Sequence, residues 1–300
     1  MFPQLLLLSN LTHPTGLVIN GAAQTEQIGW SAKFVGDLNG DGVADIAIGA
    51  PMANPSGLLK AGKVYVIFGQ QGSGRETPLN LANFTGNMGF VLSGLAAGDG
   101  LGWSVSGAGD LNADGVDDLL IGAPFAGAGQ KADSGQAYVI FGQRGRTRGP
   151  DSLNLSTLNG RTGFIINGQH PGDRLGYSVS TAGDINADGV SDILVGAPMS
   201  RSSHGRKSGQ SYFIFGQRSG FDAKFDWTRL NAATGVALIG GAAGDQSGFC
   251  VAQAGDLNGD GVSDAIIGAP FSSTKGMNSV EVMWCLENGT AWAIASIFLS

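Results

Sequence analysis

Hydrophobic residues along this chain fall in short runs of about five to seven positions, bounded by Gly, Pro, Asn or Asp. The runs are rich in β-branched and aromatic residues, and no segment keeps an apolar period of 3.6 residues. This pattern predicts short strands joined by tight turns. The run at 118–122 is apolar at successive positions, which indicates a strand buried on both faces. The sequence therefore predicts an all-β protein.

The same order of segments recurs at offsets of 73, 74 and 72 residues. Each unit has a Gly-aromatic turn, an acidic loop and Gly-Ala-Pro. The first three units continue with a run ending in Phe-Gly and a last apolar run, whereas the fourth lacks the Phe-Gly ending after 279–284. Four strands per unit form an antiparallel sheet that cannot bury both faces alone, and radial stacking of such sheets gives a β-propeller. We expect one propeller domain over 1–300, made of the following parts: an orphan strand within 1–21, repeats at about 22–94, 95–168, 169–240 and 241–284, and a divergent tail at 285–300.

Composition supports this fold class and excludes others. The 51 glycines have no three-residue period, which excludes collagen, and 42% hydrophobic residues are ample for a core. The net charge of −7 argues against nucleic-acid binding. The leucine run 5–8 matches repeat sequence better than a signal peptide, and the apolar stretch 291–299 is too short to span a bilayer as a helix. Cys250 is expected to be a small core residue in the place of Val105 and Val179.

The acidic loop has the pattern Asp-x-Asn-x-Asp-Gly-x-x-Asp. Oxygen ligands at positions 1, 3 and 5 converge when the chain turns sharply at the position-6 glycine, and position 7 offers its carbonyl. Because no His or Cys is included, the pattern favours Ca²⁺, with about four ions bound. Ordinary Asp-Gly turns are the alternative. The predicted ligands are Asp37, Asn39, Asp41, Val43 and Asp45; Asp110, Asn112, Asp114, Val116 and Asp118; Asp184, Asn186, Asp188, Val190 and Asp192; and Asp256, Asn258, Asp260, Val262 and Asp264.

These motifs together resemble the FG-GAP repeats of the integrin α-subunit propeller and its bacterial relatives. The resemblance covers residues 2 to about 284 and implies a β-propeller with Ca²⁺ loops on one face, acting in adhesion or recognition outside the cell or at its surface. Such rings usually have seven blades, whereas four repeats occur in this sequence. Either the leading strand at 17–21 pairs with 279–284 and closes a small ring, or the sheets form an open arc. We expect the open arc, because blades built for a seven-fold ring meet at too small an angle to close four; dimerisation would then hide its ends.

The sequence contains no constellation that predicts catalysis. Its histidines, His13, His170 and His204, lie in predicted loops at unrelated repeat positions, and the recurring Asp99, Asp173 and Asp245 fit turns. We therefore expect a non-enzymatic module; the alternatives are the propeller portion of a larger secreted enzyme such as a hydrolase, and a scaffold without a ligand. The loops after Gly-Ala-Pro vary most between repeats and are the expected contacts for a protein or glycan ligand. They span 52–61, 125–134, 199–208 and 271–275.

Overall fold

The computed structural model describes residues 16–72, 78–129, 131–146 and 152–272, and the backbone of 281–287 and 292–298. In this part of the chain the regular elements are strands and single 3-10 turns, and there is no α-helix. The 3-10 turns are η2 (Pro55–Gly57), η3 (Leu81–Asn83), η4 (Leu155–Thr157) and η5 (Trp227–Arg229). The expectation of an all-β protein is confirmed.

Sixteen of the strands form four antiparallel sheets of four, one per repeat, which we number as blades 1 to 4 from the N-terminus. Blade 1 contains β2 (Ser31–Gly36), β3 (Asp45–Ala50), β4 (Lys63–Ile67) and β6 (Gly89–Ser93). Blade 2 contains β7 (Ser104–Gly109), β8 (Asp118–Ala123), β9 (Gln136–Ile140) and β11 (Gly163–Asn167). Blade 3 contains β12 (Ser178–Gly183), β13 (Asp192–Ala197), β14 (Gln210–Ile214) and β15 (Gly235–Ile239). Blade 4 contains β16 (Cys250–Gly255), β17 (Asp264–Ala269), β18 (Glu281–Glu287) and β19 (Trp292–Phe298).

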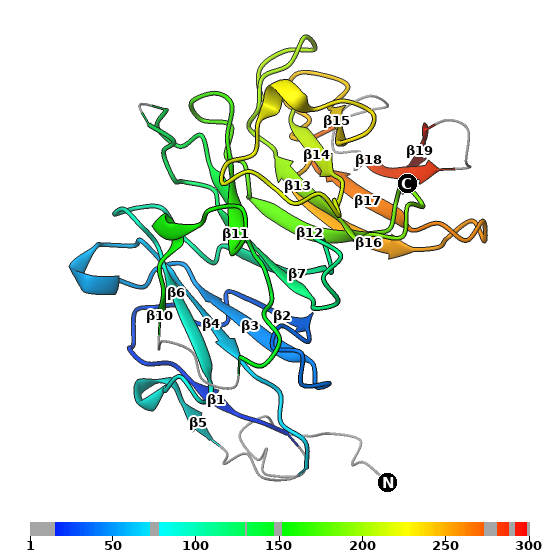
Figure 1. Cartoon of the computed structure of the whole chain (residues 1–300). Coiled ribbons are helices and arrows are strands. Elements are labelled where there is room, and N and C mark those ends of the chain that lie inside the picture. Colours follow the sequence, from blue (N-terminus) through cyan, green and yellow to red (C-terminus); the bar gives the residue numbers. More distant parts are fainter. Residues whose placement is uncertain are drawn as a thin grey trace, which may run out of the picture.

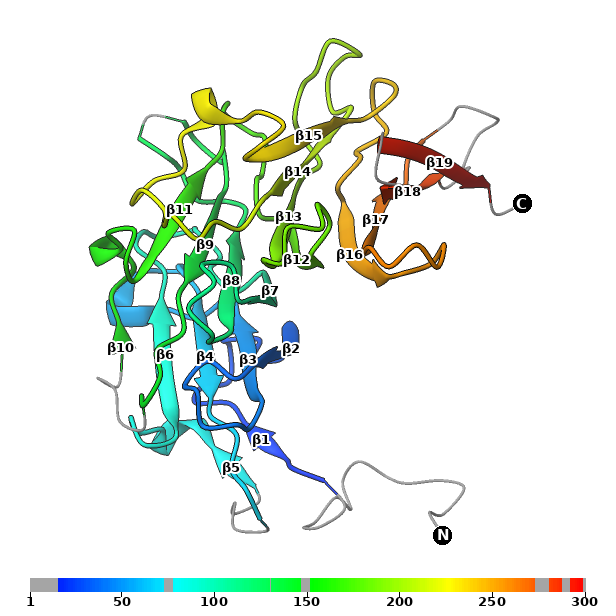
Figure 2. The ribbon, with the colours of Figure 1, turned by 45° about the vertical axis from the view of Figure 1, so that its right-hand side comes forward.

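The blades follow one another along a curved row that does not close, with blade 1 near one end and blade 4 at the other (Figures 1 and 2). The first strands, β2, β7, β12 and β16, pack against their successors along the row. Separate clusters of buried side chains lie between blades 1 and 2, between 2 and 3, and between 3 and 4. The core is therefore made where two blades meet, and the expected open arc is confirmed.

The glycine of the Gly-Ala-Pro motif allows this close approach in blades 1 to 3. A Cβ atom on Gly49 would overlap the carbonyl oxygen of Gly102 in the next blade, and Gly122 and Gly196 have the same relation to the blades that follow them. The same Gly102 carbonyl accepts a hydrogen bond from Ser31 Oγ at 2.8 Å. A side chain at Gly49 would separate the two blades, so the motif is a packing requirement.

The segment that leads to each outer strand also adds a short strand to the blade before it. β10 (Ser152–Leu153) pairs in parallel with β6, and Ala223 and Phe225 bond the backbone of Ile165 in β11. By the same rule β5 (Leu79–Asn80) pairs in parallel with β1 (Ile19–Asn20). The leading strand therefore has the place of an outer strand one blade before blade 1.

These pairings settle how the two ends of the described chain are arranged. The alternative in which the leading strand pairs with 279–284 is wrong, because β1 pairs with β5 and lies far from blade 4 (Figure 2). The fourth strand of blade 4 is β19, which pairs with β18 along its whole length. The segment 285–300 thus supplies the end of β18 and all of β19, although its sequence matches no other repeat.

Cys250 is exposed, so its assignment to the core is wrong. It begins β16 two residues after Gly248 and therefore takes the place of Ser31 and Ser104, whose hydroxyl groups bond to the following blade. No described blade follows blade 4, so this position faces solvent. The buried position of Val105 and Val179 is filled in blade 4 by Val251.

Candidate functional site

The four acidic loops lie on the same face of the arc, at equivalent strand ends of the four sheets. Each joins the first strand of a blade to the second, after a β-bulge in the first strand. The bulge ends at a glycine in the left-handed region, with φ of 80° at Gly36 and 65° at Gly109. Because successive connections of an antiparallel sheet alternate between its ends, the variable loops after Gly-Ala-Pro lie at the opposite end.

Within each loop the first, third and fifth side chains are held together by hydrogen bonds. In blade 2, the amides of Asp114 and Gly115 donate to the two oxygens of Asp110 at 2.9 and 2.8 Å. Asn112 Oδ1 accepts from the Asp114 amide, and Asn112 Nδ2 donates to Asp114 Oδ2, both at 2.9 Å. Asp114 Oδ1 accepts from the amide of Val116 at 3.0 Å. The other three loops repeat this set of bonds.

The ninth residue is buried beneath the loop. Asp118 has no exposed surface, and its oxygens accept from the amides of Leu111 and Gly142, each at 2.9 Å. Asp45 and Asp192 make the equivalent pairs of bonds. In blade 4, Asp264 Oδ2 accepts from Leu257 at 2.7 Å, and Oδ1 has no hydrogen-bond partner among the described residues. This carboxylate therefore ties the loop to its blade in the first three blades and does so only partly in the last.

Burial raises the pKa of the ninth-position carboxyls. The pKa is about 8 for Asp118, about 7 for Asp192 and about 6 for Asp45. The backbone amides oppose this shift, whereas the charges of the first and fifth carboxylates of the same loop add to it. The three carboxylates of a loop are thus close enough to repel one another, and a cation between them would relieve that repulsion.

The donor chemistry of the loops fits a hard cation. The side-chain acceptors at positions 1, 3, 5 and 9 are all oxygens, and each bonded oxygen retains a second lone pair. The carboxylate at position 5 is exposed, and the one at position 9 is buried. Within the described residues, however, no three or more His, Cys, Asp and Glu side chains are gathered as a preformed metal site. Holding an ion would require the loop to draw in, with Asn and main-chain oxygens completing the set.

Two arginines that are absent from the acidic-loop pattern also contact the loops. Arg144 Nη2 donates to the carbonyl oxygen of Gly115 at 3.0 Å, and Arg218 donates to the carbonyls of Asp188 and Gly189. Both arginines stand in the sequence Phe-Gly-Gln-Arg, directly after the third strand. That repeated tetrapeptide is the signal that could have identified them.

The face of the arc opposite the acidic loops carries the aromatic residues of the Gly-aromatic turns. Ring centroids are 4.7 Å apart for Trp30 and Trp103, 5.6 Å for Trp103 and Tyr177, and 4.9 Å for Tyr177 and Phe249. The four rings form a continuous row from blade 1 to blade 4. The repeat predicts each aromatic residue, but their mutual contact follows only from the stacking of the blades.

The variable loops flank this row. The guanidinium carbon of Arg174 lies 5.2 Å from the ring centroid of Phe125, the first residue of the second loop. Beside it, a pocket of about 730 Å³ is lined by residues that include Arg201, Arg206 and Lys207 of the third loop. Residues 130 and 273–275 of these loops lie outside the described part of the chain.

The residues assigned to turns behave as expected. Asp99, Asp173 and Asp245 are buried, and each accepts a hydrogen bond from the backbone amide three residues before it. His170 and His204 are exposed in loops. His13 lies outside the described residues.

Comparison with known proteins identifies the repeat. The model of the FG-GAP repeat family matches residues 30–67, 101–140, 175–214 and 251–279. The fold and the match define an incomplete β-propeller of this class, and the chain is an FG-GAP repeat protein that resembles integrin α chains.

Curated relatives match over part of their length. Integrin alpha-PS2 of Drosophila melanogaster is 30% identical over 253 residues, which are 83% of this chain and 15% of that protein. Integrin alpha-PS5 of the same organism is 30% identical over 181 residues, 60% of this chain and 16% of that protein. Phosphatidylinositol-glycan-specific phospholipase D of Bos taurus is 32% identical over 180 residues, 59% of this chain and 19% of that protein. The chain therefore spans less than a fifth of each of these relatives.

Among the described residues, none belongs to a helix with the length and apolar character needed to cross a bilayer.

Proposed function

We propose that this chain is a Ca²⁺-binding propeller module that recognises a protein or glycan ligand outside the cell or at its surface. The observation that carries the proposal is the fourfold repetition of one loop, with the same hydrogen bonds among its acidic and amide side chains each time. An ordinary turn needs one such residue, whereas here three carboxylates and an amide recur at fixed positions in every loop.

In each loop the ion would be held by the side-chain oxygens at positions 1, 3, 5 and 9 and by the carbonyl of the valine at position 7. For blade 2 these residues are Asp110, Asn112, Asp114, Val116 and Asp118. Bound Ca²⁺ would supply positive charge against carboxylates that otherwise repel one another. The acidic loops of blades 1 and 2 are linked, because Asp117 Oδ2 accepts a hydrogen bond from the amide of Asp37 at 2.8 Å. An ordered loop therefore also orders the boundary between two adjacent blades, which we call a seam.

The end opposite the acidic loops is the proposed recognition face. Its loops differ in sequence while the blades that carry them are constant, which is how a rigid repeat scaffold presents different contacts. The third loop supplies Arg201, Arg206 and Lys207 around one pocket, and that charge favours an acidic group on the ligand. The similarity to integrin α chains supports a role in recognition or adhesion.

A second candidate is the propeller portion of a larger enzyme. The similarity to phosphatidylinositol-glycan-specific phospholipase D favours it, because that relative is named as an enzyme and most of its length lies outside the matched region. In this case the propeller would still recognise or position the substrate, and the catalytic residues would belong to another domain. A catalytic domain in the same reading frame would decide for this candidate.

Thermal unfolding with and without Ca²⁺ tests the proposed function. A ligand that binds only the folded state stabilises it by RT ln(1 + [L]/Kd), about 2.7 kcal/mol per site at 100 times Kd. We expect a higher Tm in millimolar Ca²⁺ than in EGTA, and calorimetric titration should give about four sites. Asp114→Ala should remove one site, whereas the exposed control Asp222→Ala should remove none. Equal melting curves in Ca²⁺ and EGTA would contradict the proposal.

A further inference from the structure

Two equivalent seams of the arc are closed by different residues. Between blades 2 and 3, the ring of Phe221 stacks on Phe164, with centroids 4.4 Å apart and planes 8° from parallel. Between blades 1 and 2, the equivalent of Phe164 is Phe90, and an arginine takes the place of the stacking ring. The guanidinium carbon of Arg146 lies 4.9 Å from the Phe90 centroid. The first seam is thus lined by a cation where the second is filled by an aromatic ring.

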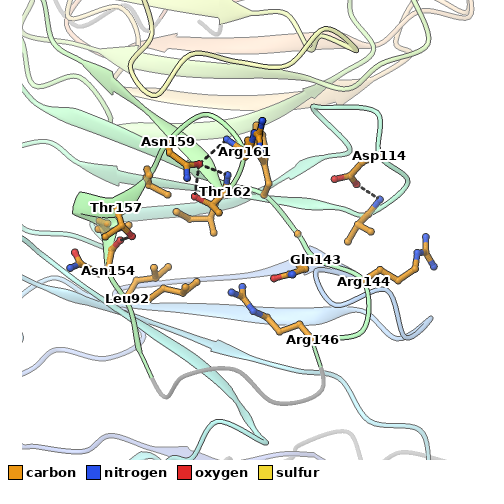
Figure 3. A pocket seen from close by; sticks show the side chains of 17 residues that line it. Leu92, Asp114, Gln143, Arg144, Arg146, Asn154, Thr157, Asn159, Arg161 and Thr162 are labelled. Atoms are coloured by element: carbon orange, nitrogen blue, oxygen red, sulfur yellow. Dashed lines mark hydrogen bonds between the residues drawn. The ribbon is translucent and has the colours of Figure 1, made fainter.

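A pocket of about 700 Å³ opens beside Arg146. Its apolar wall comes from both blades: Leu92 belongs to β6, Ile140 to β9 and Leu153 to β10, with Leu155 and Leu158 following in the crossover. Figure 3 shows Arg146 reaching from the lower edge toward Leu92, while Asn154, Thr157 and Asn159 lie along the opposite rim. The volume is in the range typical of pockets for small organic molecules.

Among the described residues, the arginines of this pocket form no ion pair. Arg146 is half-buried, and burial lowers the pKa of its guanidinium. Within the described residues, neither Arg146 nor Arg161 on the rim makes a salt bridge to a carboxylate. Asp114 borders the pocket, but its carboxylate accepts hydrogen bonds within its own loop, and Arg144 is bonded to Gly115. A half-buried guanidinium beside an apolar wall is most stable with an anion near it.

We propose that this pocket binds a small organic anion with an apolar body, such as a carboxylate or sulfonate that carries an aromatic or branched aliphatic group. Arg146 pairs with the anionic group, and the leucine wall covers the body. The polar side chains of the rim bond the remaining oxygens. Between blades 2 and 3 a separate pocket is lined by Phe221 in the place of Arg146, so it has no guanidinium over the equivalent phenylalanine, Phe164.

Calorimetric titration with two probes that share the same naphthalene body tests the proposal. The probes are naphthalene-2-sulfonate and the neutral 2-naphthalenemethanol, and the buffer contains EGTA so that the result does not depend on Ca²⁺. We expect one sulfonate per chain. Arg146→Leu should weaken sulfonate binding tenfold or more while changing binding of the neutral probe less than threefold. Arg146→Phe, which copies the neighbouring seam, should abolish binding of both.

Two controls separate loss of the site from loss of the fold. Arg229→Leu removes an exposed arginine that pairs with Asp222 near the next seam, and it should leave sulfonate binding unchanged. Arg146→Lys keeps the charge and should retain an intermediate affinity, with a Tm equal to that of the wild-type chain. The proposal is overturned if the wild-type chain does not bind the sulfonate at one site, or if Arg146→Leu and Arg229→Leu bind it equally well.

Discussion

Blade 2 and blade 4 share the same motifs, yet their equivalent residues have different surroundings. Leu111 has no exposed surface, because blade 3 covers it, and the amide of Gln217 bonds to its carbonyl at 2.9 Å. The equivalent Leu257 is 48% exposed. Gly122 has no room for a Cβ beside the Gly176 carbonyl, whereas a Cβ on Gly268 would lie 3.5 Å from its nearest neighbour, an ordinary contact. A blade of this fold is therefore completed by the blade that follows it.

The first blade shows the same dependence from the other side. Phe34 in β2 is 75% exposed, whereas its equivalent in blade 2, Gly107, lies directly against the backbone of Val35. The two ends of the arc thus expose faces that interior blades bury. This difference means that identical motifs should contribute unequally to stability at the ends of the arc and in its interior.

Truncating the buried leucine should have the largest effect. Leu111→Ala removes a fully buried side chain between two blades, and we expect the free energy of unfolding to fall by about 2 to 5 kcal/mol. Leu257→Ala removes a half-exposed side chain and should change it by less than about 1 kcal/mol. Urea denaturation of both variants in EGTA measures the difference. Equal losses would mean that blade 4 is covered in solution by something absent from this arc.

Much of this arrangement could be predicted from the sequence. The 73-residue period and the four strands per unit follow from the spacing of the apolar runs, and the open arc follows from the small angle between blades that are built for a larger ring. Within the loops, the positions that converge follow from the Asp-x-Asn-x-Asp-Gly pattern. Calcium itself stays a prediction.

The features that could not be predicted from the sequence depend on contacts between adjacent blades or strands. The assignment of Cys250 to the core rested on a register one residue out, since Val251 is the equivalent of Val105, and the exposure of Cys250 follows from the lack of a described blade after blade 4. The strand β19 has no counterpart in the repeats, since its pairing with β18 is set by backbone hydrogen bonds rather than by a shared sequence. The pocket at Arg146 depends on the contact between this arginine and Phe90 of the preceding blade, which no pattern within one blade predicts.

Removing the ninth-position carboxylate of an acidic loop should have the second-largest effect on the free energy of unfolding. Asp118→Ala leaves two buried backbone amides without acceptors, each worth about 1 to 3 kcal/mol. Release of the buried carboxylate offsets part of this, so we expect a net loss of about 2 kcal/mol in EGTA. Asp264→Ala removes a single described bond and should destabilise the chain less. The same denaturation experiment compares them, and a larger loss for Asp264→Ala would contradict the structural difference between the two blades.

The exposed end faces should promote weak self-association. If a second copy covers them, Phe34→Lys and Leu257→Lys should each shift the chain toward the monomer, because a charge replaces apolar surface at the contact. Sedimentation velocity over a tenfold range of concentration measures this. The exposed Leu59→Lys variant is the control, since Leu59 lies in a variable loop rather than on an end face. A wild-type chain that remains monomeric over that range would contradict the expectation.

The buried ninth-position carboxyls should also make the stability of the chain depend on pH. In the folded chain without metal the pKa is about 8 for Asp118, about 7 for Asp192 and about 6 for Asp45, whereas an aspartate in the unfolded chain has a pKa of about 3.9. Between pH 4 and 8 the folded chain therefore holds more protons than the unfolded chain. Stability must then fall as pH rises through this range, and below pH 4 these groups contribute no further change.

The urea midpoint in EGTA should thus be higher at pH 5 than at pH 8. Asp118→Asn should flatten the slope, because it removes the carboxyl with the largest shift while keeping one acceptor for the amides. A midpoint that rises from pH 5 to pH 8 would show that these carboxylates are ionised and stabilising in the folded chain, and that burial beneath the loop does not control their charge.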